Sequence, residues 1–204
     1  NIEPDDKVKA LICTQDLKDE SYINNHYVIM CTKKGQVKKT SLEQYSRPRS
    51  NGINAITIKD NDELLEAKLT TGNSQVLIAV KSGKCIRFEE GKTRPMGRNA
   101  SGVRGIRLKD SSDEVIGMIS VNDMDSDILV VSENGYGKRS SLEDYRITNR
   151  GGKGVKTISI TDKTGSLVSI KNVSDGDDLM IINRSGIAIR MEVSDLRVMG
   201  RATQ

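Results

Sequence analysis

The side chains best suited to chemistry in this sequence are arginines and lysines that stand beside glycines. The densest group comprises Asn149, Arg150, Gly151, Gly152, Lys153 and Gly154. Consecutive glycines let a backbone approach a phosphate closely with its N–H donors unobstructed, and guanidinium and ammonium groups bind phosphate oxygens. The segment therefore predicts an anion-binding loop, although taken alone it is equally consistent with a glycine-rich turn that carries two incidental bases.

Other kinds of site find little support in the residue types. The chain has one histidine, His26, and three widely spaced cysteines, Cys13, Cys31 and Cys85, for which buried reduced thiols are the simplest interpretation. No carboxylate pair, metal-ligand cluster or nucleophile has a recognisable spacing. Aromatic residues make up 3% of the chain, which disfavours a stacking platform for single-stranded nucleic acid. We expect no catalytic residue, no metal and no cofactor in this chain.

Length and hydropathy narrow the class of protein further. At 204 residues the chain has room for one large or two small domains. Its apolar runs are much shorter than the roughly twenty residues that cross a bilayer, and its first residues lack the basic and apolar regions of a signal peptide. We therefore expect a cytoplasmic protein with no membrane partner. The net charge is only +4, so a binding surface depends on how the charges are distributed.

A repeated unit determines where the basic residues fall. Its anchor is a turn glycine that follows an apolar run and precedes a basic run, at Gly35, Gly83, Gly135 and Gly186. The intervals of 48, 52 and 51 residues are typical of propeller-like arrays. We expect one repeat domain over 1–204, with units at approximately 25–70, 74–122, 125–173 and 177–204, the last of them partial, after the end of a preceding repeat at 1–22.

Each unit contains four short runs that read as antiparallel strands. The third runs are 53–58, 103–108 and 155–160, and the fourth are 64–69, 115–121 and 167–170, separated by Gly, Asn and Asp. The sequence thus predicts an all-β array of about four four-stranded blades. Both ends cut a repeat, so we expect either a fragment of a longer array and an incomplete disc, or an array whose first and last strands complete one shared blade.

Basic residues recur in phase with this unit, while acidic residues gather on other turns. Outside residues 149–154, the candidate DNA-binding residues are Lys38, Lys39, Arg47, Arg49, Arg94, Arg98, Arg104, Lys138, Arg139, Arg146 and Lys156. Equivalent positions of stacked units fall on one rim, so these residues predict a track for the phosphates of double-stranded DNA. For any single block a solvated charged surface would be the favoured interpretation, but three blocks in register with the repeat favour the track. A curved track implies bent DNA, read by its backbone and deformability rather than by base edges.

The segment around Arg150 also resembles a known family. Arg150 to Gly154 match the last five residues of the Gln-Arg-Arg-Gly-Gly-Lys-Gly box of the C-terminal domain of DNA gyrase A, while Thr148 and Asn149 replace the first two. The resemblance implies a β-pinwheel, whose blades exchange strands, and a non-catalytic role in wrapping DNA for ATP-dependent negative supercoiling by a type IIA topoisomerase. It further implies two partners besides DNA: the rest of gyrase A and, through it, the ATPase subunit of the enzyme, gyrase B.

One departure from the family pattern leaves alternatives open. The family box usually lies in the first blade, whereas here it falls in the third unit, with degenerate counterparts at 49–52 and 98–102. We expect the chain to begin after the first blade or two of the parent, and to wrap DNA weakly for that reason. The alternatives are the equivalent domain of topoisomerase IV, whose box is degraded, and a propeller-like scaffold that binds an acidic protein.

Overall fold

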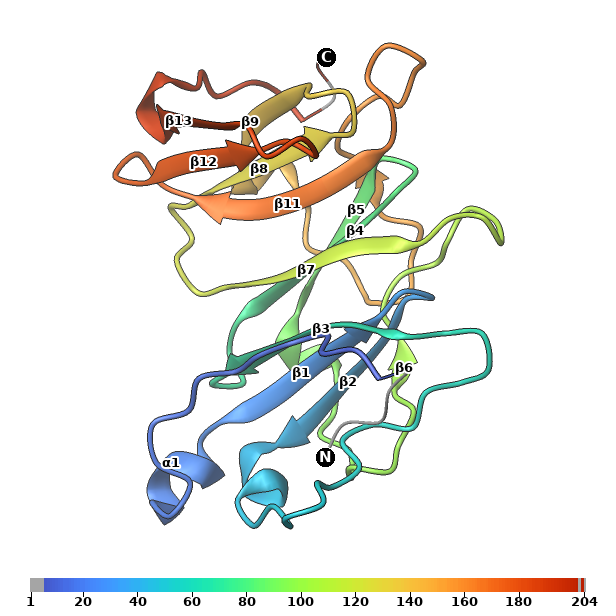
Figure 1. Cartoon of the computed structure of the whole chain (residues 1–204), viewed down its shortest axis with the longest axis vertical. Coiled ribbons are helices and arrows are strands. Elements are labelled where there is room, and N and C mark those ends of the chain that lie inside the picture. Colours follow the sequence, from blue (N-terminus) through green and yellow to red (C-terminus); the bar gives the residue numbers. More distant parts are fainter. Residues whose placement is uncertain (1–5, 202, 204) are drawn as a thin grey trace.

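The computed structural model describes residues 6–201 and 203 and is built almost wholly of short strands (Figure 1). The strands are β1 (Tyr27–Thr32), β2 (Gln36–Ser41), β3 (Leu64–Thr70), β4 (Gln75–Val80), β5 (Lys84–Glu89), β6 (Val103–Arg104), β7 (Val115–Val121), β8 (Asp127–Ser132), β9 (Gly137–Ser141), β10 (Val155–Lys156), β11 (Leu167–Val173), β12 (Asp178–Ile182) and β13 (Ala188–Glu192). One short helix, α1 (Glu20–Asn24), precedes β1. Four single-turn 3₁₀ helices follow the basic strands: η1 (Leu42–Tyr45), η2 (Glu90–Lys92), η3 (Leu142–Asp144) and η4 (Val193–Asp195). The expectation of an all-β array is confirmed.

Hairpins anchored on the turn glycines form the centre of each unit. Gly35, Gly83, Gly135 and Gly186 all have φ between 81° and 86°, a left-handed conformation that favours glycine. The apolar strands before the first three of these glycines are largely buried on both faces, as in β4, where Val76 to Val80 are all buried. A strand covered on both faces shows a continuous apolar run rather than alternation. The first three hairpins therefore lie between other layers of the structure, whereas β12 has only partly buried and exposed residues.

Strands are exchanged between successive units. Blade 1 has the order β3-β1-β2-β6, and blade 2 the order β10-β5-β4-β7. The edge strand β6 comes from the second unit, and it pairs with β2 through Val37 and Val103. In the same way β10 comes from the third unit and pairs with β5 through Cys85 and Val155. Each complete blade is thus closed by the unit that follows it.

The blades are stacked along the long axis of the molecule, with blade 1 at one end and the β12–β13 hairpin at the other (Figure 1). Strand β7 contacts both β3 and β11, so the fourth strand of each unit lies at the inner side of the stack. Strands β6 and β10 are at the opposite ends of their sheets. They form what we call the outer edge. Apolar residues of neighbouring blades share cores, one of which joins Ile29 and Val37 to Ile78 and Ile106.

The third runs of the units differ from the sequence prediction. In the second and third units they are strands of only two residues, at β6 and β10, and residues 53–58, all of which are described, form no strand. No preceding blade lies within the described residues to pair with 53–58; instead Ala10 and Ile12 from the N-terminal segment pack in the cluster that contains Ile56. Cys31 and Cys85 are buried as expected, but the prediction for Cys13 is wrong, because it is exposed.

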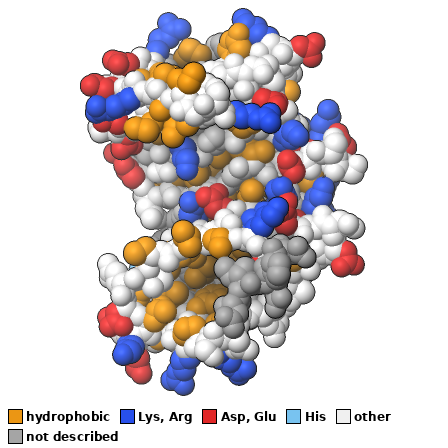
Figure 2. Space-filling view, in the orientation of Figure 1, with side chains coloured by type: hydrophobic (Ala, Val, Ile, Leu, Met, Phe, Trp, Pro, Cys, Tyr) orange, Lys and Arg blue, Asp and Glu red, His pale blue; other side chains and the backbone are white. Residues whose placement is uncertain are grey.

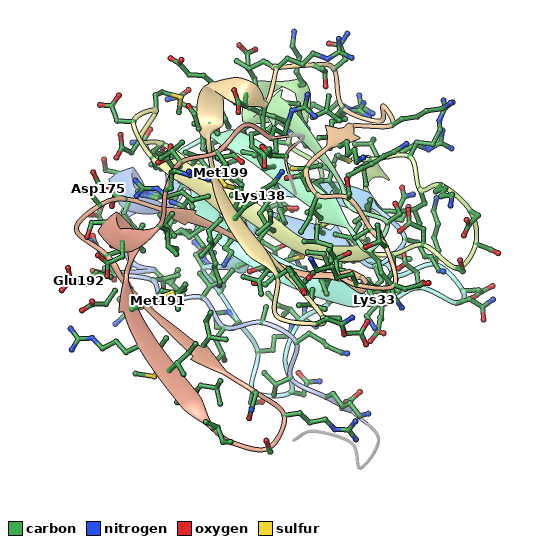
Figure 3. The ribbon with its side chains drawn as sticks, turned by 90° about the horizontal axis from the view of Figure 1, so that it is seen from above. Lys33, Lys138, Asp175, Met191, Glu192 and Met199 are labelled. Atoms are coloured by element: carbon green, nitrogen blue, oxygen red, sulfur yellow. The ribbon has the colours of Figure 1, made fainter. Side chains whose placement is uncertain are left out.

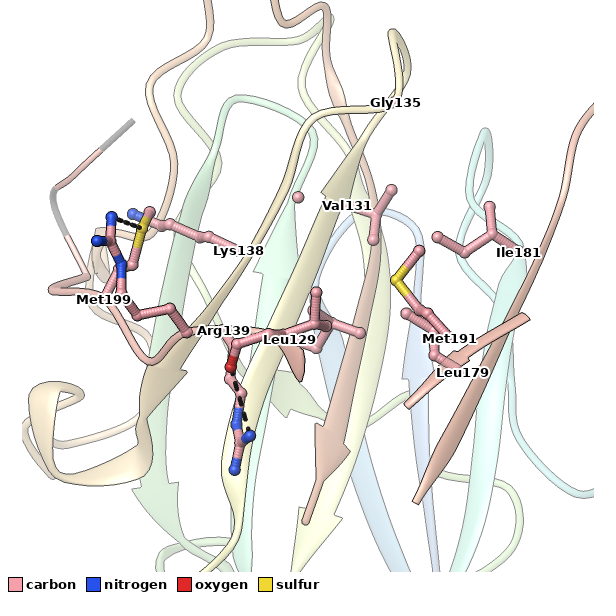
Figure 4. Close-up of a pocket in the computed structure, with 12 residues that line it drawn as sticks. Leu129, Val131, Gly135, Lys138, Arg139, Leu179, Ile181, Met191 and Met199 are labelled. Carbon is pink, nitrogen blue, oxygen red and sulfur yellow. Dashed lines mark hydrogen bonds between the residues drawn. The ribbon is translucent and has the colours of Figure 1, made fainter. Parts of the chain in front are cut away.

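The C-terminal side of blade 3 is more open than the other junctions. Blade 3 has three strands, β11-β8-β9, and the β12–β13 hairpin projects from the body beside it (Figure 3). A Cβ on Gly35 would lie 3.0 Å from the carbonyl oxygen of Ile106, and one on Gly83 would lie 2.6 Å from that of Ile158. At Gly135, by contrast, no atom of another segment lies within 4 Å of the Cβ position. A cavity of about 360 Å³ opens here between β8, β9 and the hairpin, lined by Leu129, Val131 and Met191 (Figure 4).

Candidate nucleic-acid interface

The basic strand that follows each of the first three turn glycines carries a side chain that joins two units. In β5, the Arg87 guanidinium donates to the carbonyls of Leu142 and Tyr145, at 2.6 Å and 3.0 Å, which begin and cap η3 of the next unit. In β9, Arg139 donates at 3.0 Å to the carbonyl of Val193, which begins η4. Both arginines are less than a tenth exposed. These arginines therefore link successive units through hydrogen bonds and are not surface charges.

At the first junction the same position uses an ion pair. Lys39 Nζ lies 3.0 Å from the carboxylate of Glu90, the first residue of η2, and 4.3 Å from the centroid of the Tyr27 ring. Glu90 is fully buried and also accepts from the hydroxyls of Thr70 and Ser74. The other 3₁₀ helices begin with Leu42, Leu142 and Val193, so among these helices only η2 begins with a charged residue, which it brings into a junction.

The neighbouring lysines bind carbonyls of loops, most of which belong to the next unit. Lys38 is fully buried, and its ammonium donates at 2.6 Å to each of the carbonyls of Ala55 and Arg98. Lys138 donates to the carbonyls of Gly200, Arg201 and Thr203, and it lies beside Met199 in the view from above (Figure 3). Burial is the main cause that lowers the pKa of each lysine to about 8.

The sequence-based set of DNA-binding residues is therefore corrected at four positions. Lys38, Lys39, Lys138 and Arg139 are all less than a tenth exposed, and each is engaged by carbonyl or carboxylate oxygens of this chain. They appeared as surface residues because lysine and arginine are rarely buried. Segments of the following unit cover this part of β2 and β9, so these four side chains stabilise the junctions and do not line the surface.

A second repeated arginine fastens the loops themselves. Arg150 donates from Nε to the carbonyl of Lys92 at 3.0 Å and from a terminal nitrogen to that of Arg104 at 3.1 Å. Arg201 makes the equivalent bonds to Asp144 and Lys156, one unit further on. Arg98 reaches back to the carbonyl of Asn54 at 3.2 Å. All three remain partly exposed, so they can meet an anion while they hold successive units together.

The glycines of residues 149–154 serve packing as well as any ligand. Gly151 and Gly154 have φ values of 81° and 70°. A Cβ on Gly154 would lie 2.6 Å from the carbonyl oxygen of Cys85, so the loop could not approach β5 with any other residue there. The side chains of Arg146, Asn149 and Lys153 line a pocket of about 210 Å³ above this strand. The loop is thus fixed by the neighbouring blade and leaves its basic side chains toward solvent.

The remaining predicted residues lie on or near the outer edge. Arg104 belongs to β6 and Lys156 to β10, and both are exposed. Arg94, Arg146 and Lys153 are exposed on the loops that lead to these edge strands. Arg47 and Arg49 are exposed on the corresponding loop of the first unit, which leads to residues 53–58. The fastening bonds of Arg150 and Arg201 to Arg104 and Lys156 join one edge strand to the next loop. These side chains stay candidates for contact with DNA.

Several acidic residues of the other turns have structural partners. Asp62 accepts from the backbone N–H of Lys34, and Asp113 from that of Ser82, so each carboxylate caps the turn of a β-hairpin. On the face shown in Figure 2, acidic and basic side chains are mixed, and apolar side chains gather over blade 1 and over the β12–β13 hairpin. On this face, the segregation of acidic and basic residues that the sequence predicts is not seen.

Two further observations bear on the class of protein. Among residues 6–201 and 203, no three His, Cys, Asp or Glu side chains gather in a way that could hold a metal ion. No helix in this part of the chain is long and apolar enough to cross a membrane. Strand-exchanged blades with a basic outer edge define a β-pinwheel repeat domain.

Comparison with known proteins identifies the family. The family model described as the DNA gyrase C-terminal domain, a β-propeller, matches residues 26–71, 75–122, 126–174 and 177–204. The chain belongs to this family. The DNA gyrase A protein of Staphylococcus epidermidis is 42% identical over 204 residues, and that of Staphylococcus aureus is 42% identical over 205 residues. Each alignment covers 100% of this chain and 22% of the relative, so the chain spans about a fifth of the length of these proteins.

Solved structures agree with the fold. The DNA gyrase A C-terminal domain has a TM-score of 0.78 at 25% identity, covering 88% of this chain and 60% of that one. The C-terminal domain of DNA topoisomerase IV has a TM-score of 0.82 at 23% identity, covering 88% and 56%. The second likeness concerns the fold alone. The resemblance inferred from residues 150–154 is confirmed, and the β-pinwheel with it.

Proposed function

We propose that this domain binds double-stranded DNA along its outer edge and wraps it, as a non-catalytic part of gyrase A. The observation that carries the proposal is the recurrence of exposed arginines and lysines on the loops and edge strands of successive units, Arg104 and Lys156 among them. Duplex DNA carries a negative charge about every 1.7 Å along its axis, so a line of such residues attracts it without regard to sequence.

The geometry favours curvature over binding at one point. Arg150 and Arg201 tie each loop to the edge strand of the unit before it, so that the basic side chains are held on one connected framework. Smoothly bending a site of 20 to 30 base pairs by 40° to 90° costs about 1–6 kcal/mol, and phosphate contacts spread over several units offset that cost. The ATP-dependent chemistry, in this proposal, belongs to the rest of gyrase A and to the ATPase subunit, gyrase B, in the cytoplasm.

A salt titration tests the binding. The logarithm of duplex affinity is expected to fall linearly with the logarithm of salt concentration, with a slope of about −0.9 for each phosphate contacted. Lys153→Ala removes an exposed charge and should flatten the slope by about 0.9. Lys171→Ala is the matched control, because Lys171 is an exposed lysine on the inner strand β11. An affinity indifferent to salt, together with tight binding of an acidic protein, would favour the scaffold alternative.

Wrapping is tested separately from binding. When closed circular DNA is relaxed by a nicking-closing topoisomerase in the presence of the domain, trapped curvature should appear as a change in linking number. Lys153→Ala should reduce that change, and Lys171→Ala should leave it intact. Binding without any change in linking number would contradict wrapping by this chain.

A further inference from the structure

Three arginines from two units converge on one surface pocket. Arg47 and Arg49 come from the loop after η1 of the first unit, and Arg98 comes from the corresponding loop of the second unit. The pocket has a volume of about 420 Å³ and is completed by Glu43, Gln44, Ser46 and Ile53. Three positive charges thus face one negative charge in a hollow that lies outside residues 149–154.

The position of Arg98 in this pocket is strongly fixed. Its backbone N–H donates at 3.1 Å to the Gln44 side chain, and its guanidinium donates at 3.2 Å to the carbonyl of Asn54. From below, the ammonium of Lys38 binds the carbonyls of Arg98 and Ala55 at 2.6 Å each. A buried cation that draws these carbonyls inward leaves the arginine side chain on the solvent side of its loop.

Residues 149–154 are built differently at the equivalent place. The strand position that Lys38 occupies in β2 is taken in β5 by Ile86, which lies 3.5 Å from where a Cβ on Gly152 would stand. There the loop rests on an apolar side chain and depends on three glycines. In the loop of Arg98 a lysine beneath the backbone replaces the extra glycines. The two loops therefore reach similar positions by separate means.

We propose that Arg47, Arg49 and Arg98 form a second binding site for DNA backbone phosphate, and that Lys38 is its positioning residue. The proposal rests on the function proposed above and specifies a contact point one unit before residues 149–154. Arginine suits the role because its planar guanidinium can hold two phosphate oxygens at once. The pocket is open and polar, so it admits a continuous backbone.

The test compares two groups of exposed residues by salt titration of duplex binding. Arg47→Ala/Arg49→Ala should flatten the slope by about 1.8, so that between 50 and 200 mM salt its affinity falls about 12-fold less than that of the native chain. Arg184→Ala, in the exposed turn between β12 and β13, is the control and should leave the slope unchanged. If Lys153→Ala flattens the slope and the arginine pair does not, the second site is refuted while DNA binding stands. If neither does, the proposed function itself fails.

The role of Lys38 is tested by coupling. Lys38→Met fills the space with an apolar side chain, as Ile86 does, and should weaken duplex binding while Arg47 and Arg49 are present. In the Arg47→Ala/Arg49→Ala background it should have no further effect. An equal loss in both backgrounds would indicate general damage to the fold and would overturn the positioning role. Should Lys38→Met prove too unstable to measure, Gln44→Ala removes the acceptor of the Arg98 N–H and should show the same dependence on background.

Discussion

The buried ion pair between blades 1 and 2 gives the sharpest prediction about stability. Glu90→Leu places at η2 the kind of residue that begins the other three 3₁₀ helices, but it leaves Lys39 without its carboxylate. The side chains of Lys39 and Glu90 are 5% and 0% exposed. Removing one partner of a buried pair costs about 3–5 kcal/mol, because the remaining charge stays desolvated and unpaired. For a chain of this size that corresponds to a fall in melting temperature of about 6–20 °C.

The other junctions suggest a second substitution that should restore stability. With Lys39→Arg added to Glu90→Leu, the guanidinium can donate to the carbonyls of residues 90 and 93, as Arg87 does to those of Leu142 and Tyr145. The double variant should recover most of the loss. A deficit of about 1–3 kcal/mol should remain, because the hydroxyls of Thr70 and Ser74 lose their acceptor at about 0.5–1.5 kcal/mol each.

Equilibrium unfolding in urea, followed by circular dichroism, measures all three variants. Glu89→Leu is the matched control, because Glu89 is the exposed neighbour of Glu90, and its stability should stay within about 0.5 kcal/mol of native. The reasoning is refuted if Glu90→Leu is as stable as the native chain. It is also refuted if Lys39→Arg brings no recovery, since the loss would then not come from the unpaired ammonium.

Three further predictions concern the turn glycine, the buried lysines and the cysteines. Gly83→Ala should destabilise the protein more than Gly135→Ala. Both positions have φ near 80°, but only at Gly83, of the two, would the new Cβ lie 2.6 Å from a carbonyl oxygen, that of Ile158, and such overpacking adds about 1–3 kcal/mol. Equal losses of stability would mean that the segment around Ile158 moves away at no cost. The free energy of unfolding should rise from pH 8 toward pH 10. The pKa of Lys38 and Lys138 is about 8 in the folded chain against 10.5 for free lysine, so the unfolded chain binds more protons in that interval. Lys138→Met should reduce the rise, and an undiminished rise would exclude Lys138 as its source. A thiol reagent should label Cys13 alone in the native protein, since burial raises the pKa of the Cys31 and Cys85 thiols, and all three in denaturant; rapid native labelling of three thiols would contradict the burial.

The repeat and its glycines could be predicted from the sequence, because a positive φ and a close backbone contact leave a visible mark in residue type. The location of the basic strand residues could not, since segments of the following unit bury positions that local composition assigns to the surface. One signal was nevertheless available. The third residue after the turn glycine is Lys38, Ile86, Lys138 and Ile189 in successive units, and isoleucine is a residue type that is most often buried. The position is buried in the first three units, although Ile189 is half exposed.

The partners of the residues that link successive units were harder to predict from the sequence. Lys39, Arg87 and Arg139 each stand four residues after a turn glycine, but what they bind is a backbone carbonyl or carboxylate about fifty residues away. Backbone carbonyls leave no trace in residue type. By contrast, Arg104, Arg146 and Lys156 were predicted as surface residues and are exposed, because they lie on loops and edge strands that no later unit covers.

Closure of each blade by the following unit also bears on how the chain is synthesised and shortened. Val37 pairs with Val103, which lies 66 residues later in the chain. While blade 1 emerges from the ribosome, the edge of β2 therefore stays unpaired until more than one further repeat has been translated. Contacts between residues so far apart in the sequence form slowly. Deleting a single repeat from the gene would disturb two neighbouring sheets at once, so length variants of such an array should arise by joining whole strand-exchanged pairs rather than by cutting at the boundaries visible in the sequence.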